Sequence, residues 1–142
     1  MIEAAALVAP NRIAALLGLE PKGKAFLRRR LVSRGGEPTE MVSLWVPVEL
    51  SQGTDLTSAE PLLQGLREHL RSRKGVRFDH IVEQVTARMP TADETKRLGM
   101  PKNTPLPAVY GAVRDASGTA PAVVEALLPA DRHELEDAYP IG

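Results

Sequence analysis

Apolar residues of the types favoured in strands (β-branched, aromatic and leucine) are frequent on both sides of a Gly-Gly pair over residues 26–47, where we expect two β-strands joined by a tight turn. Gly35-Gly36 supplies the positive-φ residues that a two-residue hairpin requires. With a period of two, Arg28 and Arg30 share one face of the first strand. A cation between apolar strand positions must be paired, solvated in a cleft, or extended to water from an edge. The hairpin is therefore the first indication of an anion-binding site, and ordinary solvated strand arginines are the alternative.

Helical periodicity predicts two helices on either side of this hairpin. The first covers residues 11–17, with Asn11 as its N-cap and Gly18 ending it. The second covers residues 61–74 and ends at Gly75. Its apolar face consists of Leu63, Leu66 and Leu70.

Residues 76–89 are expected to form a long strand. A bulge is expected near residues 79–80, because Phe78 lies in a different phase from the apolar residues that follow it. Those residues are Ile81, Val85, Ala87 and Met89. Thr91 and Glu94 then have the spacing of a capping box, which predicts a third helix ending at residue 98.

The end of the chain predicts a second hairpin, over residues 106–128, and a tail whose residues 132–135 add an edge strand. Residues 1–10 are rich in Ala and are expected to be an arm or a linker remnant. The order of helix, Leu-Gly and hairpin occurs twice, and Leu17-Gly18 recurs as Leu98-Gly99 after 98 − 17 = 81 residues. The sequence therefore predicts an α+β fold of two pseudo-repeated halves.

Composition narrows the class of protein. The 142 residues carry 18 Lys and Arg against 18 Asp and Glu, so no global charge steers the chain to nucleic acid or to a membrane surface. The absence of Cys excludes disulfides and zinc–thiolate sites, and it is typical of a cytoplasmic protein. No apolar run approaches the roughly 20 residues that span a bilayer, and the start lacks the basic region of a signal peptide.

The order of several short motifs resembles a known family. Gly-Gly-Glu-Pro at 35–38 and Trp-Val-Pro at 45–47 precede Leu-Gly-Met-Pro at 98–101. This order resembles the UTRA domain, the effector-binding half of HutC-type regulators in the GntR family. The resemblance implies a chorismate-lyase-like antiparallel sheet of about six strands with flanking helices. It also implies a small-molecule site in a cleft, and homodimers.

In such regulators a winged helix-turn-helix domain precedes the effector domain. Residues 1–10 and one short helix are too little for a three-helix DNA-binding unit. We therefore expect residues 11–142 to be a UTRA-like domain that contacts DNA only through a domain absent from this chain.

The resemblance also suggests ligand-binding residues. Arg30 matches a family arginine that grips an anionic effector, and a guanidinium suits that task because it offers paired donors. Val32 and Val42 stand where the family has a second arginine and a glutamate, which favours a less charged, more apolar effector. Glu125 matches a family position that contacts ligand hydroxyls, and the internal repeat makes Ser43 its counterpart. The further candidates are Arg28, Tyr110 and Arg114.

Other chemistry has less support in the sequence. The three His residues lie at no metal-ligand spacing, and no cofactor motif or catalytic triad is found, so we expect no metal, no cofactor and no catalytic residue. Three hypotheses remain. The first is a non-catalytic ligand sensor that forms homodimers. The second is a small chorismate-lyase-like enzyme using Arg30 and Glu125, and the third is a dimerisation module with a vestigial cleft.

Overall fold

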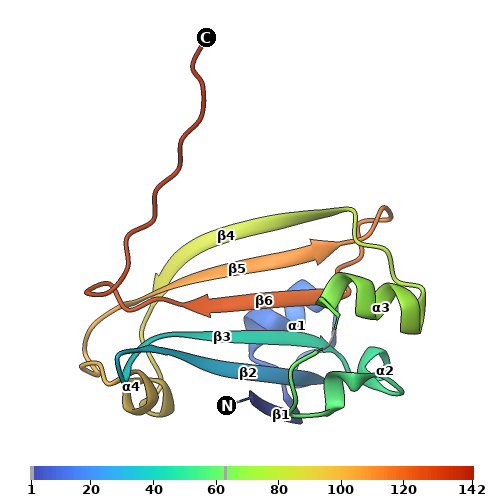
Figure 1. Ribbon diagram of the computed structural model, residues 1–142, viewed down its shortest axis with the longest axis horizontal. Coiled ribbons are helices and arrows are strands. Elements are labelled where there is room, and N and C mark those ends of the chain that lie inside the picture. Colours follow the sequence, from blue (N-terminus) through green and yellow to red (C-terminus); the bar gives the residue numbers. More distant parts are fainter. Residues whose placement is uncertain (1, 63) are drawn as a thin grey trace.

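Six strands form one antiparallel sheet in the computed structural model, which describes residues 2–62 and 64–142 (Figure 1). The strands are β1 (Ile2–Val8), β2 (Lys24–Arg34), β3 (Glu37–Pro47), β4 (His80–Arg88), β5 (Leu106–Arg114) and β6 (Ala122–Leu127). Their order across the sheet is β1-β2-β3-β6-β5-β4, so β1 and β4 are the two edges. The predicted α+β class and both predicted hairpins are confirmed.

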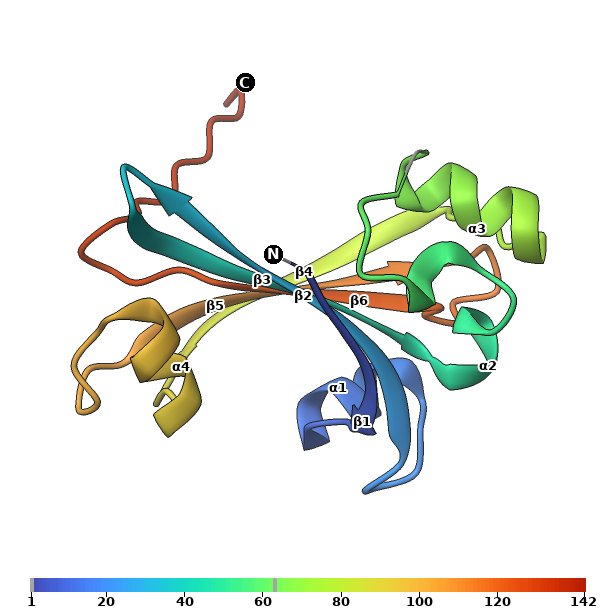
Figure 2. The same cartoon turned by 60° about the horizontal axis from the view of Figure 1, so that its bottom comes forward.

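Helices cover the two faces of the sheet separately. On one face lie α1 (Asn11–Leu17) and α4 (Ala92–Leu98), and on the other α3 (Leu66–Lys74), as the edge-on view in Figure 2 shows. The short helix α2 (Val48–Ser51) and the 3₁₀ turn η1 (Asp55–Thr57) belong with α3. Ile13, Trp45 and Leu98 contribute to the core under α1 and α4. Phe26, Leu56 and Leu70 contribute to the core under α3.

The predicted internal repeat is confirmed, and it is longer than expected. The series β1-α1-β2-β3 recurs as β4-α4-β5-β6, and α1 and α4 start 92 − 11 = 81 residues apart. Gly18 and Gly99 end the two helices in the same left-handed conformation, with φ of 73° and 60°. Ser43 pairs with Glu125 across the β3–β6 boundary, and these residues are 125 − 43 = 82 apart. The pseudo-two-fold axis therefore passes near this pair.

Most of the segment expected to be an arm or a linker remnant belongs to the sheet. Residues 2–8 form β1, which pairs with β2 at seven positions. Small Ala side chains give this strand a weak sequence signal, although it is the repeat counterpart of β4. Asn11 is the first residue of α1 rather than its cap, because Pro10 occupies the N-cap position. At the other end of the chain, residues 132–135 form no strand, and the tail runs away from the sheet (Figure 1).

Two further boundaries differ from the prediction. Helix α3 begins at Leu66, five residues after the expected start at Pro61, and Leu63 lies outside the described residues. Strand β4 begins at His80 and pairs with β5 without a register shift, so the expected bulge is absent from this pair. The phase change has a different cause, because Phe78 packs into the core under α3 from a segment that precedes the strand.

An ion-pair cluster joins α4 to the sheet. Arg88 at the end of β4 donates from both terminal nitrogens to the Glu94 carboxylate, with both N–O distances at 2.8 Å. Glu94 also accepts from the Thr91 backbone N–H at 2.9 Å, which completes the predicted capping box. Burial opposes ionisation of Glu94, but the hydrogen bonds from Arg88 and Thr91 outweigh it and lower the pKa of this carboxyl.

We expect Glu94→Gln to lower the free energy of unfolding by about 2–3 kcal/mol, because Arg88 loses its main charged partner in a largely buried site. Chemical denaturation at neutral pH measures this change. A depressed carboxyl pKa stabilises the fold above its ordinary value of 4.5, and this contribution is lost as the pH falls through the folded-state pKa. The difference between wild type and variant should therefore shrink below about pH 4.5.

Asp93→Asn is the matched control. Asp93 is exposed in the same helical turn and pairs only with Arg97 among the described residues. The Asp93→Asn substitution should lower the free energy of unfolding by less than about 1 kcal/mol. If both variants lowered the free energy of unfolding equally, the negative charge at the start of the helix, rather than the ion pair with Arg88, would account for the loss of stability.

Candidate functional site

A cavity of about 510 Å³ lies between the sheet and the segment that leads into α3. Val42, Leu44 and Val124 form its floor on β3 and β6, and each is only partly buried. These positions share one sheet face because Val42 pairs with Ala126 and Leu44 with Val124. The opposite wall and the rim are formed by Ile2, Pro61, Leu62, Gln64, Gly65 and Leu66. The cavity is therefore lined mainly by apolar side chains.

Arg28 holds the chain segment that leads to this wall. Its guanidinium donates to the carbonyl oxygens of Leu56 and Glu60, both at 3.0 Å, and makes a short contact with the Ser58 carbonyl. Burial lowers the pKa of Arg28, and no carboxylate of the described residues forms an ion pair with it. Arg28 thus lines the cavity, as a predicted ligand-binding residue should. Its terminal nitrogens, however, bind the protein's own backbone.

Arg30 lies two residues further along β2, on the same face and at the border of the cavity. Its side chain is exposed, and within residues 2–62 and 64–142 the guanidinium has no hydrogen bond or ion pair. Its register partner on β3 is Val42. Arg30 is thus a free cation beside an apolar floor, with all of its donors available.

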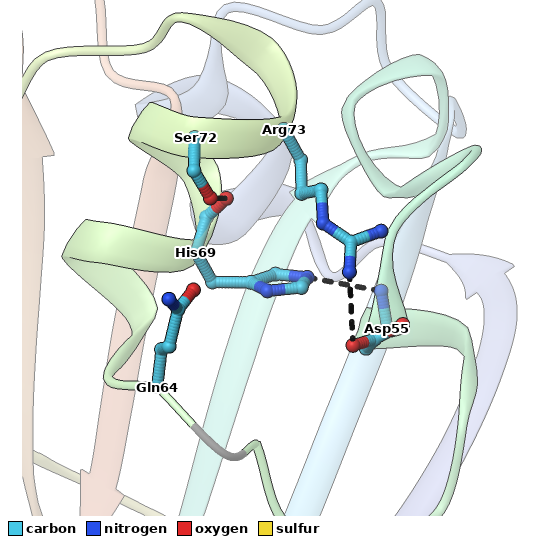
Figure 3. Close-up of a pocket in the computed structure, with 5 residues that line it drawn as sticks. All are labelled: Asp55, Gln64, His69, Ser72 and Arg73. Carbon is cyan, nitrogen blue, oxygen red and sulfur yellow. Dashed lines mark hydrogen bonds and ion pairs between the residues drawn. The ribbon is translucent and has the colours of Figure 1, made fainter.

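A smaller cavity of about 280 Å³ lies on the other side of Gln64 (Figure 3). Buried His69 on α3 accepts a hydrogen bond at Nε2 from the Asp55 backbone N–H at 2.9 Å. Arg73 approaches the Asp55 carboxylate at 3.6 Å. These two contacts fix η1 against α3, so His69 and Arg28 position the same segment from opposite sides.

Glu125, Tyr110 and Ser43 lie on the opposite face of the sheet, under α1 and α4. Glu125 is buried, and its carboxylate forms an intramolecular ion pair with Arg88 at 3.3 Å. The Tyr110 hydroxyl accepts from Arg88 at 3.0 Å. Burial raises the pKa of Tyr110, with Glu125 adding to the effect. Ser43 is buried and accepts from Arg29 at 2.9 Å.

Glu125 and Tyr110 border a cavity of about 390 Å³, where the Arg12 guanidinium also lies 4.8 Å from the centre of the Tyr110 ring. Its lining includes both arginines and carboxylates, and Glu94 and Glu125 both form ion pairs with Arg88. The charged groups that line this cavity already form hydrogen bonds or ion pairs with other residues of the protein. It is a weaker candidate site than the apolar cavity.

The predicted site residues are therefore split among three places. Arg28 and Arg30 lie at the cavity on the α3 face, and Ser43, Tyr110 and Glu125 lie on the other face. Arg114 reaches neither, because it donates to the Gly118 carbonyl at 2.8 Å in the β5–β6 turn. Arg30 and Glu125 cannot act on one substrate through the sheet, so the residue pair behind the enzyme hypothesis is not supported.

Apolar lining residues were missed by sequence reasoning. Val124 and Leu44 alternate with the predicted Glu125 and Ser43, so the strand period contained the signal needed to find them. No such signal exists for Leu62, which comes from a segment of irregular structure. Within the described residues, no group of three His, Asp or Glu side chains is arranged to hold a metal ion. None of the helices found there has the length and apolar character needed to cross a membrane.

Comparison with known proteins identifies the family. The UTRA domain family matches residues 1–134. An uncharacterized HTH-type transcriptional regulator of Streptomyces coelicolor is 28% identical over 109 residues, which cover 75% of this chain and 40% of that protein. The chain thus spans well under half the length of this curated relative.

Solved structures share the fold. A GntR-family transcriptional regulator from Bacillus cereus superposes with a TM-score of 0.81 at 19% identity, covering 99% of this chain and 96% of that one. The effector domain of PhnF from Mycobacterium smegmatis gives 0.72 at 20% identity, covering 99% and 89%. With the family match over nearly its whole length, the chain belongs to the UTRA domain family.

Proposed function

We propose that this chain is the small-molecule effector-binding domain of a GntR-family transcription regulator of the HutC subfamily. The effector binds in the apolar cavity on the α3 face, and binding changes the DNA affinity of a winged helix-turn-helix domain outside this chain. The domain forms homodimers and acts in the cytoplasm, where the DNA is. The observation that best supports the proposal is a cavity of about 510 Å³ bordered by one unpaired arginine. This volume is typical of small-molecule sites.

The lining indicates the chemistry of the effector. The floor of Val42, Leu44 and Val124 offers no hydrogen-bonding side chain, so it favours an apolar body. Arg30 offers paired donors at the border, which suit a carboxylate or a phosphate. The proposed effector is therefore a partly apolar metabolite with one anionic group.

Coupling to DNA requires that the effector bind two arrangements of the domain with different affinity. The cavity lies between the sheet and the segment leading into α3, so a ligand in it would contact both. Arg28 and His69 hold that segment through backbone contacts alone. A ligand that contacts both the floor and Leu62 would stabilise one arrangement of this wall.

A thermal-shift screen against phosphorylated sugars, carboxylates and small apolar metabolites tests the proposal. A saturable rise in melting temperature, with the compound unchanged after incubation, supports a sensor. Consumption of the compound would instead favour the enzyme hypothesis. The absence of any shift would favour a dimerisation module with a vestigial cleft.

For an anionic compound found in this screen, Arg30→Met should weaken binding about tenfold or more, because a charge-assisted contact is worth roughly 1.5–3 kcal/mol. Isothermal titration measures the loss. Arg34→Met is the matched control, since Arg34 lies at the end of the same strand and outside the cavity lining. Equal affinity in wild type and Arg30→Met would remove Arg30 from the site.

Arg28→Met should act differently, because it leaves the carbonyl groups around residues 55–60 without their donor. We expect a loss of about 2 kcal/mol or more in the free energy of unfolding without ligand. Binding of neutral and anionic compounds should weaken to a similar degree, whereas Arg30→Met affects only anions. An Arg28→Met protein with wild-type melting temperature would contradict the anchoring role of this residue.

A further inference from the structure

A row of polar residues crosses the sheet on the face that α1 and α4 cover (Figure 2). Its members are register partners on neighbouring strands, so their side chains share this face. In the order of the strands across the sheet they are Glu3, Arg29, Ser43, Glu125, Tyr110 and Gln84. Ser43, Glu125 and Tyr110 are each at most 4% exposed, so the middle of the row is buried among the core residues under α1 and α4.

The rows on either side of this polar row are apolar over the four central strands. One row consists of Leu27, Trp45, Val123 and Ala112, and the other of Leu31, Met41, Leu127 and Ala108. Apolar residues at the polar positions would continue this core without the cost of burying charged groups. Departures from the pattern of a core are expected at functional sites. The polar row therefore indicates a site on this face of the sheet.

The cavity of about 390 Å³ on this face is lined by two arginines that lack a carboxylate partner among the described residues. Within residues 2–62 and 64–142, Arg29 donates only through Nε to Ser43, so its two terminal nitrogens are free. Arg12 donates to the neutral side chain of Gln84 at 3.2 Å. The positive charges of both guanidinium groups are therefore uncompensated.

The carboxylates near the cavity are paired with other arginines. Their ion pairs in the described structure are Glu94–Arg88, Glu125–Arg88, Asp93–Arg97 and Glu3–Arg97. The Glu125 pair is the longest of the four at 3.3 Å, because Arg88 already binds Glu94 at 2.8 Å through both terminal nitrogens. Glu125 is thus a buried carboxylate that can accept a further cationic partner.

The two uncompensated cations lie toward different ends of the cavity, with Glu125 between them. Arg29 is on β2, and the Arg12 guanidinium lies 4.8 Å from the centre of the Tyr110 ring on β5. Strands β3 and β6 separate β2 from β5, so these positions are about 14 Å apart across the sheet, at about 4.8 Å per strand. Glu125 lies on β6, between them. A ligand in the cavity therefore meets positive, negative and positive charge in turn.

We propose that this cavity is a second small-molecule site, and that it binds an acidic amino acid. Such a molecule carries an ammonium group between two carboxylates, which is the complementary order of charges. Arg29 and Arg12 each bind one carboxylate through free N–H donors, and the ammonium group binds Glu125. The site lies on the opposite face of the sheet from the apolar cavity, so the proposal goes beyond the proposed function and does not rest on it.

Isothermal titration with L-glutamate and two analogues tests the order of charges. Glutarate has both carboxylates but no ammonium group, and L-glutamine has the ammonium group but only one carboxylate. Each analogue should bind about tenfold or more weakly than L-glutamate, because each lacks one charge-assisted contact in a partly buried site.

Variants of the arginines locate the amino acid on the protein. Arg12→Met should weaken L-glutamate binding about tenfold or more. Because Arg12 is exposed, this variant should keep the wild-type melting temperature without ligand. Arg29→Met should weaken binding as strongly. Arg30→Met is the matched control and should bind L-glutamate as the wild type does, because Arg30 lies on the same strand as Arg29 and on the other face of the sheet.

Any of three results would overturn the proposal. If neither L-glutamate nor L-aspartate bound to the wild type at up to about 10 mM, the polar row would have a structural role alone. Binding that is lost in Arg30→Met but retained in Arg12→Met and Arg29→Met would place the amino acid in the apolar cavity. Glutarate binding as tightly as L-glutamate would remove Glu125, and with it the amino group, from the recognition.

Discussion

The strict alternation of side chains across a single sheet is the constraint on which the rest of this structure depends. The side chain of each strand residue points either to the face covered by α1 and α4 or to the face covered by α3, and never to both. Consecutive residues such as Val42 and Ser43 therefore have unrelated surroundings: the first borders an apolar cavity, and the second is buried against Arg29. Which of two consecutive strand residues can border a binding site therefore depends on the sheet face to which its side chain points.

The arginines on the two faces of the sheet have different kinds of partner. On the α1 and α4 face, Arg88 is neutralised by Glu94 and Glu125, and hydrogen bonding to Glu94 raises its pKa. On the α3 face, Arg28 is held by carbonyl dipoles, and no carboxylate of the described chain pairs with it. Its charge is therefore only partly compensated, and it lies beside the cavity that Arg30 borders. The two arginines beside the apolar cavity thus have no carboxylate partner among the described residues.

Much of this fold could be predicted because the signals were local. Gly35-Gly36 determines the hairpin turn, and Thr91 with Glu94 determines the start of α4. The site could be predicted only in part. Arg30 follows from its strand and the family resemblance, but Arg28 is held by residues 27 to 32 positions away in the sequence. Placing Glu125 with Arg30 ignored the strand register, which sets Arg30 opposite Val42 and Glu125 opposite Ser43, one residue along.

The two edge strands show how far the halves of the repeat have diverged. β1 and β4 are repeat counterparts, and identical apolar edges on both would allow copies to add without limit. The centre of β1 instead carries Ala4, Ala5 and Ala6, and its Glu3 is paired with Arg97 of α4 at 2.6 Å. These side chains are short, whereas Val85, which follows Ala4 by the repeat distance of 85 − 4 = 81 residues, is larger and 63% exposed. Divergence of the repeat has thus given the two edge strands different side chains on equivalent backbones.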